Sequence, residues 1–97
     1  MKEQNKLIAE FMGLWYTEEN YLYNPQFEKA FKDDELLYNI SWDWLIPVID
    51  KIYSSDYYIK YKESLGQFGE GIFINTKFII STYNDVIEFI NWYNQQN

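Results

Sequence analysis

The 97-residue chain contains no cysteine, no histidine and no arginine. Without cysteine it has no disulfide, no thiolate nucleophile and no cysteine-based zinc site. Without histidine it lacks the side chain that most often acts as a general base near neutral pH. Without arginine it lacks the bidentate group that grips phosphate and guanine. These absences predict a protein that is not an enzyme and that does not bind DNA or RNA directly, because affinity for nucleic acid comes largely from cationic contacts to phosphate.

Long apolar runs are missing as well. No stretch approaches the roughly 18 apolar residues of a membrane span, and the opening residues Met1 to Asn5 are not followed by the apolar core of a signal peptide. We therefore expect a cytoplasmic protein that has no contact with a membrane. We also expect no cofactor and no metal ion.

Aromatic and acidic residues are abundant. Four Trp, seven Phe and ten Tyr make up 22% of a chain whose length fits one domain, residues 1–97. So many large rings exceed the needs of one small core, so some tyrosines should lie at the surface, either as bulk composition or as a binding face. Fifteen acids and eight lysines give a net charge of −7. This charge favours basic partners, of which nucleic-acid-binding proteins are the commonest.

Amphipathic patterns predict three helices. The first covers Glu3 to Met12, and Gly13 follows where a left-handed cap is expected. The second starts at Ser41, whose hydroxyl would cap the free backbone N–H groups. The last begins near Thr82, which stands at capping-box spacing from Asp85.

Period-two alternation predicts the strands. Residues 56–62 alternate along YYIKYK, residues 63–71 contain glycines typical of a hairpin connection, and residues 71–75 form the return strand. The predicted fold class is therefore α+β, with a small antiparallel sheet of two or three strands packed with three helices. The expected order is helix, insert, helix, strand, strand, helix.

The insert, residues 14–40, is the least regular part of the chain. A connection this long is uncommon in a compact domain unless it carries function or its own structure. We expect Trp15 to fold back onto the core and Asn24-Pro25 to open a helical turn. Three adjacent acids rarely converge on one cation, so the acidic run is interpreted as a solvated loop or a partner-binding patch. The insert residues predicted to face a partner are Tyr16, Glu18, Glu19, Tyr21, Tyr23, Asp33, Asp34 and Glu35.

Three stretches carry a resemblance: NKLIAEFMG at 5–13, SWDWLIPVIDKI at 41–52 and VIEFINWYN at 86–94. Together they resemble a group of short uncharacterised phage and prophage proteins, best known from Bacteroides-like hosts. The pattern is also similar to the phage ABA sandwich domain, in which helices cover both faces of a small sheet. The resemblance implies a phage setting, and it supplies no enzymatic activity to carry over.

Small acidic phage proteins often neutralise host defences, and by this analogy we predict an anti-defence protein. It would bind a basic host protein, such as a CRISPR effector nuclease or another nucleic-acid-processing complex, and inhibit it through the acidic, Tyr-rich surface. One alternative is a small-ligand binder that sequesters a nucleotide immune signal, against which the lack of arginine argues. The other is a structural phage protein. The sequence leaves the oligomeric state open.

Overall fold

The computed structural model of the protein describes residues 1–66 and 71–96. Its elements are best given in chain order: α1 (Lys2–Phe11), β1 (Trp15–Tyr16), β2 (Leu22–Asn24), β3 (Lys29–Phe31), the 3₁₀ turn η1 (Asp33–Glu35), α2 (Trp42–Tyr53), α3 (Asp56–Ser64) and α4 (Ile79–Asn94). The three strands form one antiparallel sheet in the order β1-β2-β3. The α+β class is therefore confirmed, although the described residues form four α-helices instead of three.

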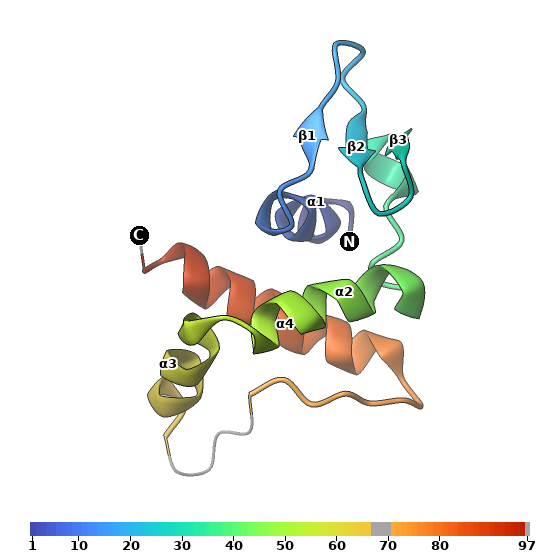
Figure 1. Cartoon of the computed structure of the whole chain (residues 1–97). Helices are drawn as coiled ribbons and strands as arrows, with labels where there is room; N and C mark the ends of the chain where they lie inside the picture. Colours follow the sequence, from blue (N-terminus) through green and yellow to red (C-terminus); the bar gives the residue numbers. More distant parts are fainter. Residues whose placement is uncertain (67–70, 97) are drawn as a thin grey trace.

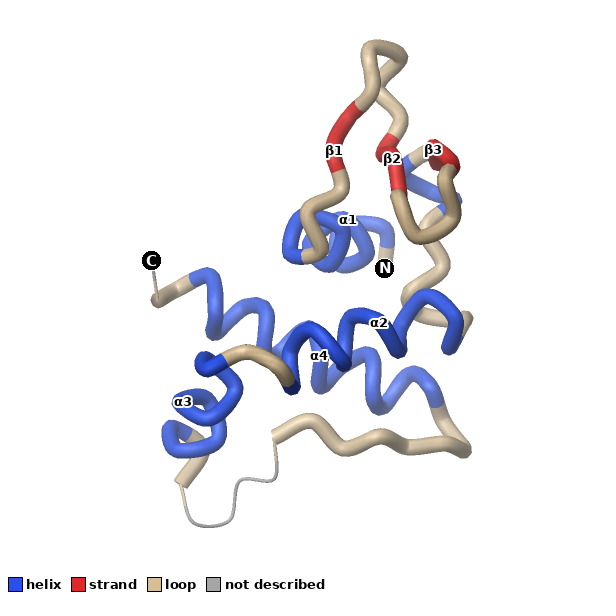
Figure 2. The backbone as a smooth tube through the Cα atoms, in the orientation of Figure 1, coloured by secondary structure: helices blue, strands red, loops and turns tan. Residues whose placement is uncertain are grey.

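Helix α4 is the centre of the molecule, and α1, α2 and α3 all pack against it (Figure 1). The core between these helices contains fully buried aliphatic side chains such as Ile8, Leu45, Val48 and Ile90. The sheet lies at one end, near α1, while α3 lies at the opposite end (Figure 2). No helix in the described ranges combines the length and apolar character needed to cross a bilayer.

The strands do not lie where period-two alternation placed them. Residues 56–62 belong to α3, whose first turn is capped by the Ser55 hydroxyl accepting from the Tyr57 N–H. Tyr57 and Tyr61 are also one helical turn apart, and both rings pack against α4, with Tyr61 5.2 Å from Phe89 between ring centroids. The prediction of a strand here is wrong. A spacing of four residues puts the tyrosines on one face of a strand and also on one face of a helix, and packing against the core favours the helix.

Residues 71–75 form neither a helix nor a strand, so the prediction of a return strand here is wrong. Side chains of α4 bind the backbone of this segment instead. The Asn75 N–H donates to Thr82 Oγ1 (2.7 Å), the Thr82 hydroxyl donates to the Phe73 carbonyl (3.2 Å), and the Phe73 N–H donates to Asp85 Oδ2 (3.2 Å). Thr82 and Asp85 are therefore not a capping box, and α4 begins three residues earlier, at Ile79. The predicted hairpin connection at 63–71 falls partly outside the described residues.

The insert contains the sheet. A tight loop joins β1 to β2, with Asn20 in the left-handed region at φ 67°, as three-residue hairpin loops require. At the next connection Asn24 Oδ1 accepts from the Gln26 N–H (3.0 Å). The pair Asn24-Pro25 therefore opens a hairpin turn, and the expected helical turn is wrong.

The predicted first and second helices are confirmed. Helix α1 ends at Phe11, and Gly13 follows with φ 80°. Helix α2 begins directly after Ser41, but the Ser41 side chain makes no capping hydrogen bond. Its carbonyl instead accepts from the Leu45 N–H (3.0 Å), as in an ordinary first turn.

A buried polar network joins α1 to α4. Asn5 Nδ2 donates to the Leu36 carbonyl and to Asn39 Oδ1, both at 3.0 Å, and the Tyr83 hydroxyl donates to Asn5 Oδ1 at 2.8 Å. Asn5 and Tyr83 are both buried. Burial raises the pKa of Tyr83 from 10.0 to about 12, because the phenolate would lose its hydration.

This shift predicts a loss of stability in alkali. The folded state holds the Tyr83 proton more tightly than the unfolded chain does, so the stabilisation is complete below pH of about 10 and disappears as the pH rises towards about 12. We expect the free energy of unfolding, measured in urea, to fall across that window. The Tyr83→Phe variant should lose less over the same interval. Equal losses in the two proteins would contradict the assignment to Tyr83.

Candidate functional site

The two faces of the sheet differ. Trp15 pairs with Tyr23, and Tyr23 pairs with Ala30, so these three side chains share one face. Leu22, which pairs with Phe31, points to the other face and is buried. The Leu22 side is therefore the inner face, and the Trp15 side is the outer face.

Rings on the inner side hold the sheet against α2. Trp44 is buried, and its ring centroid lies 4.9 Å from that of Phe27, 4.8 Å from that of Phe31 and 5.0 Å from that of Tyr38. Phe27 and Phe31 come from the β2–β3 hairpin, and Tyr38 comes from the loop before α2. Such edge-to-face and tilted contacts each add about 0.5–1.5 kcal/mol beyond area burial. The sheet is thus fixed to the helices before any partner arrives.

A hydrogen bond reinforces this attachment. Pro47 has no N–H, so it leaves the Asp43 carbonyl, four residues earlier in α2, without its helical donor. Gln26 Nε2 donates to that carbonyl at 2.9 Å. The β2–β3 turn therefore satisfies the acceptor that Pro47 leaves free.

The outer face presents aromatic rings. Trp15 is 54% exposed, and its ring centroid lies 5.0 Å from that of Tyr23. Tyr21 stands two residues before Tyr23, hence on the same side of the strand, and is 37% exposed. We call Trp15, Tyr21 and Tyr23 the aromatic face. Exposed rigid rings with polar ends are typical of binding surfaces.

Two carboxylates stand at the tip of the same hairpin. Glu18 and Glu19 are exposed in the loop between β1 and β2, which projects from the body of the molecule (Figure 1). The loop is closed by the Thr17 N–H donating to the Tyr21 carbonyl (2.7 Å) and by the Tyr21 N–H donating to Thr17 Oγ1 (3.2 Å). Neither glutamate forms a salt bridge with any residue that the structure describes, so both charges are free to meet a partner.

In the acidic run at 33–35, unlike at the hairpin tip, two of the three carboxylates contact other residues of the chain. Asp33 Oδ2 lies 3.6 Å from Lys6 Nζ, and this carboxylate raises the pKa of Lys6 above its usual value. Glu35 Oε1 accepts from the Lys32 N–H at 2.8 Å and closes η1. Asp34 alone of the three is exposed and without a hydrogen bond or salt bridge to the described residues. This run therefore contributes mainly to the contact between η1 and α1.

The structure divides the set of residues predicted to face a partner. It brings Tyr21 and Tyr23 together on the outer face, with Glu18 and Glu19 at the tip, while the acidic run belongs to η1. Tyr16 is 50% exposed but pairs with Leu22, so it lies on the inner side at the edge of the sheet.

Sequence reasoning missed Trp15. We expected this residue in the core, and that expectation is wrong because the inner face is occupied by Leu22 and Phe31. The alternation Tyr21-Leu22-Tyr23, with one apolar residue between two tyrosines, is the signal that would have indicated a two-faced strand.

Known proteins give no further guide to this surface. No family model, no curated protein and no solved structure matches the chain. The resemblance to small phage proteins therefore stays a prediction.

Metal binding finds no support in the described ranges, where no group of three or more acidic, histidine or cysteine side chains could hold an ion. The candidate functional site is accordingly the β1–β2 hairpin, with its aromatic face and acidic tip.

The outer rings should contribute little to stability. We expect Tyr21→Ser and Trp15→Ser each to change the free energy of unfolding by no more than about 1 kcal/mol, since both rings lie on the partly solvated outer face and not in the core. Leu22→Ser, on the buried side of the same hairpin, should cost about 3 kcal/mol or more through lost burial and an unpaired hydroxyl. Urea denaturation of the three variants measures this. A similar cost for all three would mean that the outer rings are part of the core.

Proposed function

We propose that this chain is a protein-binding inhibitor of phage type, which docks the β1–β2 hairpin onto a basic surface of a host nucleic-acid-processing complex. A CRISPR effector nuclease is the kind of complex we have in mind. The site of action would be the host cytoplasm. The observation that carries the proposal is the hairpin itself, which combines exposed rings with unpaired carboxylates on a fixed support.

The two parts of the hairpin suit two parts of an interface. Aromatic rings such as Trp15 and Tyr21 are the residues that most often serve as buried anchors. Carboxylates at the rim steer association and select basic partners, while contributing less to affinity. Because the rings are already in place, few side chains have to be ordered on binding, which lowers the entropic cost of association.

The net charge also favours recognition of a basic partner. At −7 the protein repels phosphate polymers and attracts the cationic grooves in which nucleic acids bind. A surface with carboxylates and flat rings presents to such a groove some of the features of a nucleic acid strand, namely negative charge and planar rings that can stack. Occupation of the groove would exclude the natural ligand.

Recovery of partners from a bacterial lysate, at low and at high salt, tests the proposal. We expect basic proteins to be retained at low ionic strength and released at high ionic strength, because the Debye length falls to about 3 Å at 1 M salt. The double variant Glu18→Lys/Glu19→Lys should retain the same partners about tenfold more weakly, and Trp15→Ser should lose them through loss of the anchor.

The matched control carries the same charge change away from the hairpin. Glu63 and Glu88 are exposed on α3 and α4, so Glu63→Lys/Glu88→Lys alters the net charge equally. Binding that falls equally in both double variants would indicate a bulk charge effect and would contradict docking by the hairpin. Recovery of acidic proteins, indifferent to salt, would contradict the proposal as a whole.

A further inference from the structure

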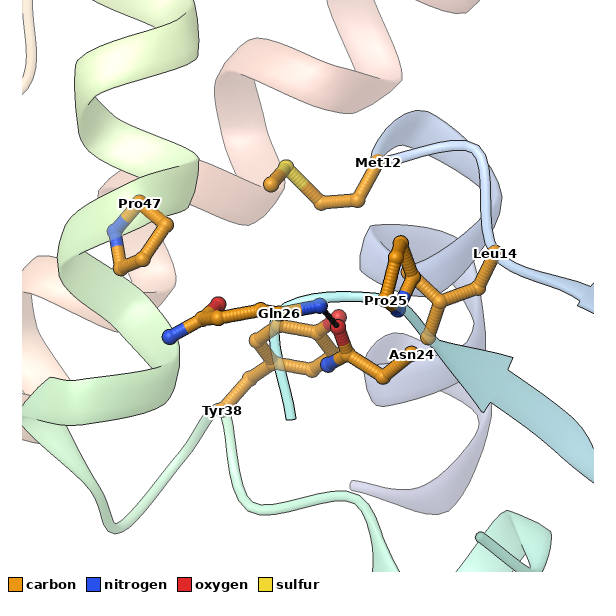
Figure 3. A pocket seen from close by; sticks show the side chains of 7 residues that line it. All are labelled: Met12, Leu14, Asn24, Pro25, Gln26, Tyr38 and Pro47. Atoms are coloured by element: carbon orange, nitrogen blue, oxygen red, sulfur yellow. Dashed lines mark hydrogen bonds between the residues drawn. The ribbon is translucent and has the colours of Figure 1, made fainter. Parts of the chain in front are cut away.

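A hollow of about 340 Å³ is lined by Asn24, which lies on the same face of β2 as the buried Leu22, so the hollow is on the inner side of the sheet. Figure 3 shows the side chains that line it. It is bounded by the end of α1, the β2–β3 turn, the loop before α2 and α2 itself. Its walls are largely apolar and come from Met12, Leu14, Pro25 and Pro47. This volume is at the lower end of the range of small-molecule sites, which are typically apolar with a few placed polar groups.

Two buried polar side chains form the polar end of the hollow. Tyr38 is 2% exposed and Asn24 is 4% exposed, and both line it. Figure 3 shows the Tyr38 ring directed from its loop towards the side chains of Asn24 and Gln26. Asn24 Oδ1 is occupied by the Gln26 N–H.

The remaining hydrogen-bonding groups of this pair are free. Neither the Tyr38 hydroxyl nor Asn24 Nδ2 bonds to any residue in the ranges 1–66 and 71–96, and neither is among the fully buried unpaired side-chain atoms, so solvent reaches both. In the free protein water can meet these donors, and a ligand that accepts from them would replace those bonds to water inside a largely apolar site. Burial also raises the pKa of Tyr38, so the phenol stays protonated near neutral pH and can donate. The hollow thus offers two donors behind apolar walls.

We propose that this hollow binds a small uncharged molecule of one or two rings that carries a carbonyl group, with the carbonyl oxygen accepting from the Tyr38 hydroxyl and the Asn24 carboxamide. The rings would lie between Leu14, Pro25 and Pro47. No charged side chain of the described residues lines the hollow, so a phosphate-bearing nucleotide has no counter-charge there. The site is independent of the aromatic face, which lies on the other side of the sheet.

A ligand here would also connect two parts of the fold. The hollow is bounded by the β2–β3 turn and by α2, which Gln26 already links through its bond to the Asp43 carbonyl. A ligand that binds only the folded state raises the melting temperature by mass action. Binding should therefore stabilise the attachment of the sheet to the helices.

Titration of the full chain with 1-indanone and with indane tests this site. The two probes share one skeleton, and only 1-indanone has a carbonyl. We expect 1-indanone to produce saturable shifts in proton–nitrogen correlation spectra, concentrated at Leu14, Gln26 and Tyr38. Indane should bind the same place about a hundredfold more weakly, the equivalent of the two hydrogen bonds that its missing carbonyl would accept.

Two variants complete the test. Tyr38→Phe should reduce the affinity for 1-indanone about tenfold, part of the way to that for indane, because Asn24 Nδ2 still donates. The melting temperature should not fall, because the hydroxyl has no hydrogen-bond partner in the described part of the fold. Leu14→Trp should fill the hollow and abolish binding of both probes, its spectrum showing that it remains folded. The proposal is overturned if 1-indanone gives no localised shifts at millimolar concentration, if indane binds equally well, or if Tyr38→Phe leaves the affinity unchanged.

Discussion

The Trp44 side chain holds the small sheet on the helical core. Its ring contacts Phe27 and Phe31 from the sheet and Tyr38 from the following loop, and it is itself buried on α2. Strands of two or three residues cannot form a stable sheet alone. The sheet exists because its inner face is packed against this ring, and the bond from Gln26 to the Asp43 carbonyl fixes its position along the helix. Everything we infer about surfaces depends on this attachment.

The attachment leaves two features that a closed core would not have. On the outer side of the sheet, the aromatic face leaves large rings partly exposed to solvent, next to the β1–β2 loop with its two unpaired carboxylates. Inside, a hollow remains beside Tyr38, between the β2–β3 turn and α2. The abundance of aromatic residues thus has two explanations: most of the rings form the joints between elements, and a few form a surface. The surface rings contribute to partner binding in our account, and among the buried rings Tyr38 contributes to the hollow.

The sequence predicted an element correctly where the spacing of apolar residues fitted only a helix, or where a nearby residue such as Gly13 marked the end of the helix. Helix α1 with Gly13, helix α2 and the presence of a last helix could all be predicted, although α4 begins earlier than expected. Residues 56–62 could not, because their tyrosines fit a strand and a helix equally well and tertiary packing decided. The sheet was missed because strands this short show hardly one cycle of alternation. Of the candidate site, Tyr21, Tyr23, Glu18 and Glu19 were predictable from composition, but which face each ring occupies follows from strand register, and the hollow is assembled from four separate segments.

Our central claim is that the hairpin is ordered in the free protein and carries its binding face ready-made. Hydrogen exchange of the backbone amides in β2, measured on the isolated protein, tests this claim most directly. The account predicts that these amides exchange at least about a hundredfold more slowly than in an unstructured chain, as expected for a sheet held by packing against Trp44. Exchange of the β2 amides at unstructured rates, while those of α4 remain protected, would show that the sheet is not attached in the free protein and would contradict the account.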